Sequence, residues 1–243
     1  ALFLLAVALF AVGPFVFMVL ISFQNIYFVS GNPLSWIPRS FTLDPYLQVL
    51  QTPNFLRWVF NSLFVASSVT AIVLLVHSLA GYVFARKEFP GKHFLFLLIL
   101  AGIMVPKAVV IVPSFLLVRQ LGLLNTYYGL ILPPLALPIG VFLMRQFFQA
   151  IPQELEDAAR IDGCSDFAVF WRIVVPLSMP AIAAFTLFYA VSHWNTYFNA
   201  LIYLSDSEKW TLQVLIKALV IDADSNSQIV GADARIVPQE TIR

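Results

Sequence analysis

Long apolar runs dominate the chain. A helix needs about 20 apolar residues to cross the ~30 Å hydrocarbon core of a bilayer at a rise of about 1.5 Å per residue. Segments that meet this length lie at residues 1–22, 58–85, 94–118, 128–149 and 178–204. The pattern therefore predicts five spans in an all-α, polytopic membrane helical bundle. We expect this bundle to be a single transmembrane domain over residues 1–243.

The short connections between these segments predict which side of the membrane each one faces. The connection at residues 86–93 carries three Lys or Arg residues, whereas the one at residues 121–127 carries none. Because short cytoplasmic loops are enriched in Lys and Arg, we assign residues 86–93 to the cytoplasm. By alternation, residues 150–177 are also cytoplasmic, and residues 23–57 and 205–243 are external.

Composition supports the membrane class and excludes several others. Hydrophobic residues make up 60% of the chain and charged residues 11%, whereas soluble domains carry charge on roughly a quarter of their residues. A net charge of +1 provides no basic field for nucleic acid. Cys164 is the single cysteine, so no disulfide can form within the chain.

Prolines interrupt the apolar segments, at positions 106, 113, 133, 134 and 138. A proline removes a helical hydrogen bond, and in lipid the carbonyl that it frees must find another partner. Such breaks are either kinks that improve helix packing or openings that line a polar cavity. Both interpretations place these segments in the interior of a bundle.

Residues 151–176 form a cytoplasmic loop whose sequence predicts two short helices. Pro152 suits the first position of a helix, and Gly163 can adopt the left-handed conformation that ends one. Ser165 can then cap a second helix that continues to Pro176. The expected product is a bent helix pair on the cytoplasmic face.

The first helix of this pair is amphipathic. Glu154, Glu156 and Asp157 place negative charge near its positive end. The apolar residues Leu155, Ala158, Ala159 and Ile161 form a small, shallow surface. This surface suggests a docking site for a partner protein, and the alternative is a helix that lies on lipid headgroups.

The same loop resembles the EAA loop of ABC-importer permeases, whose pattern is Glu-Ala-Ala, three residues, Gly, nine residues, Ile, any residue, Leu, Pro. The register is filled by Asp157, Ala158, Ala159, Gly163, Ile173, Val175 and Pro176. Asp157 replaces the family's Glu and Val175 its Leu. The resemblance implies that the residues coupling the chain to an ATPase are Glu154, Asp157, Ala158, Ala159, Asp162, Gly163, Ile173 and Pro176.

Shorter matches, at residues 61–62, 122–126 and 194–195, are similar to the carbohydrate-uptake branch typified by the maltose importer. The resemblance implies half of a heterodimeric pathway for a sugar or oligosaccharide, in the inner membrane of a bacterial or archaeal cell. The implied partners are a second permease subunit, two cytoplasmic ABC ATPase subunits and an extracytoplasmic sugar-binding protein. Members of this branch have six spans, so the sixth is expected beyond Arg243.

The chain itself has no G-x-x-x-x-G-K-[ST] motif, the phosphate-binding loop of ATPases. We therefore expect that the chain is not an enzyme and that it binds neither a cofactor nor a metal. ATP and Mg²⁺ would be bound by the partner ATPases.

Polar residues within the spans are candidates for the substrate pathway. Lys107 follows Pro106 inside a predicted span, where it either contacts an acidic sugar or reaches toward the outer surface. Near the end of the fifth span, amide and aromatic side chains suit sugar recognition, or else form an interfacial aromatic belt. These residues are Trp194, Asn195, Tyr197 and Asn199.

Two other function classes fit the sequence less well. An intramembrane enzyme or channel would need acidic groups within the spans. The predicted spans contain no Asp or Glu, which argues against this class. An ABC-importer permease for another polar solute is the nearer alternative.

Overall fold

A computed structural model describes residues 2–24 and 41–218, and every regular element in these ranges is helical. The chain divides into two units, Ala1–Leu56 and Arg57–Arg243. The predicted external segments 23–57 and 205–243 lie partly outside the described residues. The all-α prediction is confirmed for the part that the structure describes.

The first unit contains α1 (Leu2–Ser22) and α3 (Asp44–Gln51). The end of α1 contacts α3 through Ser22 Oγ, which lies 2.5 Å from the Tyr46 hydroxyl. The rings of Phe23 and Tyr46 pack with their centroids 5.2 Å apart. α1 coincides with the first predicted span.

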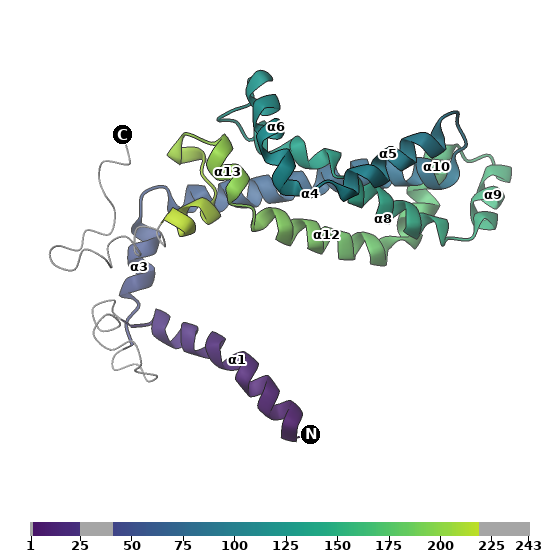
Figure 1. Cartoon of the computed structure of the whole chain (residues 1–243). Coiled ribbons are helices and arrows are strands. Elements are labelled where there is room, and N and C mark those ends of the chain that lie inside the picture. Colours follow the sequence, from purple (N-terminus) through teal and green to yellow (C-terminus); the bar gives the residue numbers. More distant parts are fainter. Residues whose placement is uncertain (1, 25–40, 219–243) are drawn as a thin grey trace. The chain divides into compact units, whose positions relative to one another are not determined.

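The second unit is organised along α4 (Phe55–Arg86), which runs the length of this unit in Figure 1. In the described residues, α4 is the one helix that is long and apolar enough to cross a membrane by itself. The number rises to four if each sharply bent helix pair counts as one span. The second predicted span, 58–85, therefore lies within one continuous helix.

The third and fourth predicted spans are not straight helices. α5 (Lys92–Met104) and α6 (Lys107–Gln120) meet at an angle of 107°. α7 (Tyr128–Ile131) and η1 (Pro133–Ala136) meet α8 (Pro138–Gln149) at 51°. At both breaks the residue before a proline is extended, because the proline ring disfavours the helical conformation there.

The loop and the fifth predicted span form a series of short helices. They are α9 (Gln153–Ile161), α10 (Asp166–Val169), the π-helical η2 (Phe170–Val174), α11 (Val175–Leu177), α12 (Met179–Trp194), α13 (Phe198–Tyr203) and η3 (Ser207–Lys209). The segment predicted as one span over 178–204 is therefore not one continuous helix, because residues 195–197 interrupt it. Residues 212–218 are helical as well.

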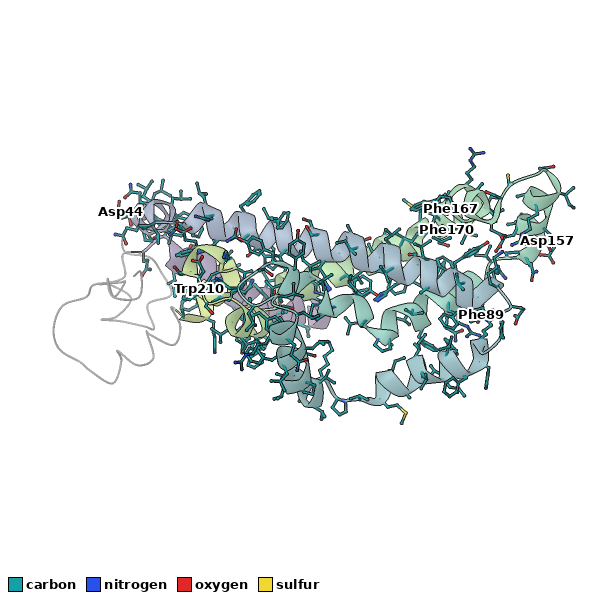
Figure 2. All side chains as sticks on the ribbon, turned by 90° about the horizontal axis from the view of Figure 1, so that it is seen from above. Asp44, Phe89, Asp157, Phe167, Phe170 and Trp210 are labelled. Atoms are coloured by element: carbon teal, nitrogen blue, oxygen red, sulfur yellow. The ribbon has the colours of Figure 1, made fainter. Side chains whose placement is uncertain are left out.

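Two apolar clusters stabilise the second unit at its opposite ends. One contains Val69 and Val73 of α4 together with Tyr203. The other joins Tyr82 to the Phe148 and Phe170 rings. Figure 2 shows Phe89, Asp157, Phe167 and Phe170 at one end of the bundle, here called the coupling end, and Trp210 at the other.

Helix packing at the coupling end depends on Gly81. A Cβ atom at this position would lie 2.6 Å from Met144 Cβ, which is closer than real Cβ atoms approach. The absence of a side chain therefore lets α4 and α8 pack in direct contact, as expected for small residues between membrane helices.

Candidate functional site

The loop at the coupling end has the bent shape that its sequence predicts. Gly163 adopts φ +87°, in the left-handed region that favours glycine. The Gly163 amide donates to the Arg160 carbonyl over 3.0 Å, which closes the end of α9. Ser165 caps α10, since its hydroxyl accepts from the Ala168 amide at 3.3 Å. The bend and the cap are both confirmed.

An apolar face of this loop is open to contact. We define the docking face as Leu155, Ala158, Ile161 and Phe167, all of which are exposed. Ile161 is 86% exposed and Phe167 66%. Exposed apolar side chains grouped on one short loop are typical of a protein–protein contact. Glu154, Asp157 and Asp162 are also exposed and surround this face with negative charge.

Ala159 does not belong to the exposed surface on which the sequence placed it. It is buried in the apolar cluster that contains Phe148 and Phe170. Helical periodicity explains the difference, because Ala159 lies three residues after the buried Glu156 and shares its inward face. Its small side chain allows α9 to approach the bundle. Ile173 is half-buried against the same cluster, and Pro176 is exposed in α11.

Glu156 is fully buried and ties α9 to α4. Its Oε1 lies 2.6 Å from Arg86 Nε, and its Oε2 accepts a hydrogen bond from the Tyr82 hydroxyl at 3.1 Å. Arg160 on the same helix is 3.3 Å from Oε2. We call Glu156, Arg86 and Tyr82 the acid anchor. A buried carboxylate is costly unless it is paired, and here two guanidinium groups and one hydroxyl lie around it.

Sequence reasoning missed the acid anchor and treated Glu156 as a charge at a helix end. The positions of these residues in the sequence were the one signal that could have indicated the contact. Glu156 and Ala159 are three residues apart on one helical face, and Arg86 ends a 32-residue apolar helix. No sequence rule, however, pairs two residues that are 70 positions apart.

The second helix of the loop is held by Lys87, the residue that follows α4. Lys87 Nζ lies 2.5 Å from Asp166 Oδ2, in the first turn of α10. The hydrogen bond from Lys87 holds the pKa of the Asp166 carboxyl below its usual value. Arg86, the last residue of α4, and Lys87, which follows it, therefore hold α9 and α10 respectively.

The predicted pathway residues lie at helix breaks. Lys107 is exposed at the start of α6, next to the 107° bend, and makes no ion pair with any described residue. It interacts electrostatically with His193 of α12. Trp194 ends α12, Asn195 and Tyr197 lie in the break before α13, and Asn199 is half-buried on α13. Four of the five candidates therefore cluster at one break.

Comparison with known proteins identifies the family. The family model for binding-protein-dependent transport system inner membrane components matches residues 77–232, a range that includes the whole loop. The chain belongs to this family. Protein LplC of Bacillus subtilis is 38% identical over 239 residues, covering 98% of this chain and 80% of that protein. The family is one of transporter permeases, so the expectation that the chain is no enzyme is confirmed.

Two further relatives of this permease family are named for sugar transport. The polygalacturonan/rhamnogalacturonan transport system permease protein YtcP of Bacillus subtilis is 40% identical, over 90% of this chain and 76% of its own length. A crystal structure of a bacterial ABC transporter involved in the import of the acidic polysaccharide alginate matches with a TM-score of 0.81. That match has 26% identity and covers 99% of this chain and 86% of the other. The resemblance to carbohydrate-uptake ABC permeases is confirmed.

Proposed function

We propose that the chain forms one half of the membrane pathway of an ABC importer for acidic oligosaccharides, next to a second permease subunit. It would cross the inner membrane of a bacterial or archaeal cell several times. An extracytoplasmic sugar-binding protein would deliver the substrate, and two cytoplasmic ATPases would bind ATP and Mg²⁺. The names of the relatives, which include transporters for polygalacturonan and alginate, support an anionic substrate.

The observation that carries this proposal is the environment of Lys107. Placing an ammonium group in the membrane interior costs about 2.5 to 3.5 kcal/mol on insertion scales. Lys107 has no acidic partner among the described residues to offset that cost. It also occupies the start of α6, where the helix dipole is positive and no side chain caps the helix. Two sources of positive potential thus coincide, and together they favour a carboxylate of the substrate.

The test compares transport of two oligosaccharides matched in length, one neutral and one built of uronic acids. In Lys107→Met, uptake of the acidic oligosaccharide should fall about tenfold relative to the neutral one, as expected for the loss of one charge-assisted hydrogen bond. Lys107→Arg keeps the charge and should preserve the ratio. An unchanged acidic-to-neutral ratio in Lys107→Met would remove the substrate role and favour a lysine that reaches toward the outer surface.

Coupling to ATP hydrolysis would use the loop at the coupling end. The docking face would lie in a cleft of one ATPase, so that closure of the ATPase pair moves α9 and α10 together. Arg86 and Lys87 would pass this displacement to α4. The pathway would then alternate between inward-open and outward-open states, as rocking bundles do in other transporters.

A further inference from the structure

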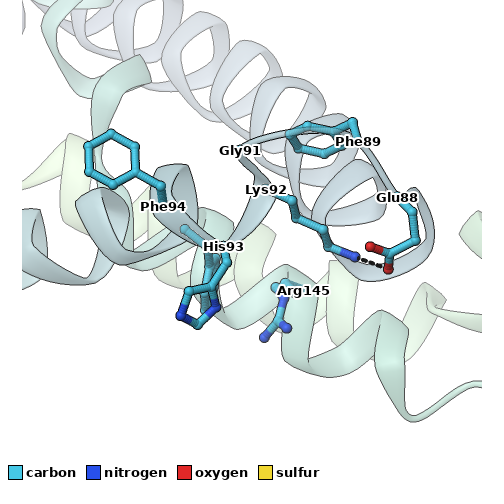
Figure 3. A pocket seen from close by; sticks show the side chains of 8 residues that line it. Glu88, Phe89, Gly91, Lys92, His93, Phe94 and Arg145 are labelled. Carbon is cyan, nitrogen blue, oxygen red and sulfur yellow. Dashed lines mark hydrogen bonds and ion pairs between the residues drawn. The ribbon is translucent and has the colours of Figure 1, made fainter.

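A pocket of about 620 Å³ lies at the coupling end, outside the loop and apart from the candidate pathway. It forms where α4 gives way to α5, and α8 closes its other side. Figure 3 shows the polar side chains that line it, Glu88, Lys92, His93 and Arg145, together with Phe89 and Phe94. From this geometry we infer a binding site for the phosphate headgroup of an anionic phospholipid.

Arg145 supplies the main recognition group. Its Nε donates to the Phe84 carbonyl at 3.2 Å, and its guanidinium carbon lies 4.1 Å from the centre of the Phe96 ring. These contacts fix the guanidinium plane between α4 and α5. The two terminal nitrogens have no partner among the described residues, so their N–H groups are available to two oxygens of one phosphate.

The charge in the pocket suits a singly charged phosphodiester. Lys92 is paired with Glu88 at 2.8 Å. The Glu88 side chain is 88% exposed and that of Lys92 is 18% exposed. Glu88 can therefore swing into water while Lys92 turns to a phosphate. The positive charges of Arg145 and Lys92, less the negative charge of Glu88, leave the pocket with a net charge of +1.

The surface beside the pocket suits acyl chains. α5 continues from the pocket with exposed apolar side chains, among them Phe94, Leu95, Leu97 and Leu98. A headgroup at Arg145 would thus have its hydrocarbon tails along α5. Basic pockets between membrane helices, at the level of the headgroups, are typical sites for anionic lipids. Charge complementarity and the adjacent apolar flank together favour a lipid over a soluble phosphate compound.

The experiment uses the assembled transporter in detergent, with bound lipids counted by native mass spectrometry during titration. Phosphatidylglycerol should bind at one tight site, and phosphatidylcholine should not occupy it. Arg145→Gln and Lys92→Gln should each weaken phosphatidylglycerol binding about fivefold, as expected for one basic group near a headgroup. Arg119→Gln, which removes the same charge at the end of α6 outside the pocket, should leave binding unchanged.

Three results would overturn the inference. The first is tight phosphatidylglycerol binding in both pocket variants at the level of Arg119→Gln. The second is displacement of the lipid by millimolar glycerol phosphate, which would indicate a soluble phosphate ligand. The third is efficient crosslinking of Phe94→Cys to the second permease, which would show that protein covers the pocket. If Arg145→Gln fails to assemble, Lys92→Gln carries the test, because within the described ranges the Lys92 side chain pairs only with the exposed Glu88.

Discussion

At the scale of single residues, the acid anchor is a buried contact that joins α9 of the loop to α4. Glu156 is inaccessible to water, and the Arg86 side chain is 9% exposed. A buried ion pair of this kind contributes little net stability compared with apolar residues of similar size, but the loss of one partner leaves an uncompensated buried charge. We therefore expect the pair to determine how α9 packs on α4.

Removing one partner should destabilise the permease more than removing both. Glu156→Gln should cost roughly 3 kcal/mol because Arg86 is left buried and unpaired. Arg86→Met should cost a similar amount, and the double variant Glu156→Gln with Arg86→Met should lose less than either single change. The measurement is the apparent melting temperature of the assembled transporter, for the parent, both single variants and the double variant.

Glu154→Gln is the matched control for this cycle, since Glu154 lies on the same helix but is exposed. It should shift stability by no more than about 0.5 kcal/mol. Strictly additive losses in the double variant would argue against a coupled pair.

At the scale of elements, local signals in the sequence predicted the loop well. Gly163, Ser165 and the two short helices follow from turn and capping chemistry between near neighbours, and the structure has all of them. The breaks in the spans were less predictable. Pro106 indicates where α5 ends, but the angle of 107° depends on packing against segments far away in the sequence. The acid anchor was missed for the same reason, since it joins residues 70 positions apart.

We expect the bend between α9 and α10 to determine the orientation of the docking face. Gly163→Val should strain the left-handed backbone by about 1 to 2 kcal/mol and favour another bend. A Cβ atom at this position would meet nothing within 4 Å, so the effect comes from backbone conformation and not from a clash. Transport should fall strongly, while the permease still inserts and folds.

Gly163→Asn provides the control for that substitution, because asparagine tolerates the left-handed region better than other non-glycine residues. It should retain most of the transport activity. The readouts are uptake in vesicles and ATPase activity stimulated by the binding protein. Parent-level transport with full ATPase assembly in Gly163→Val would contradict a role for the bend.

At the scale of the whole molecule, the two ends of the second unit differ in chemistry. The coupling end carries the docking face, the acid anchor and the basic pocket. At the other end, side chains of α4 hold the segment after α13. Trp58 donates to the Ser207 carbonyl at 2.7 Å, and Asn61 donates to the carbonyls of Glu208 and Trp210, each at 2.9 Å. An ATP-driven importer needs two different ends, because its energy source and its substrate arrive from opposite sides of the membrane.

Sidedness can be tested with Cys164, the single cysteine of the chain. The sequence assigns this residue to the cytoplasm because residues 86–93 are rich in Lys and Arg, and the structure holds the loop against the end of α4. In right-side-out vesicles, a membrane-impermeant maleimide should leave Cys164 unmodified until detergent opens the membrane.

A second variant, Cys164→Ser with Ser205→Cys, moves the thiol to the exposed Ser205 position at the other end. It should react in intact vesicles, since residue 205 is assigned to the outside. Labelling of Cys164 in intact vesicles, with Ser205→Cys protected, would invert the topology and place the docking face where no ATPase could reach it.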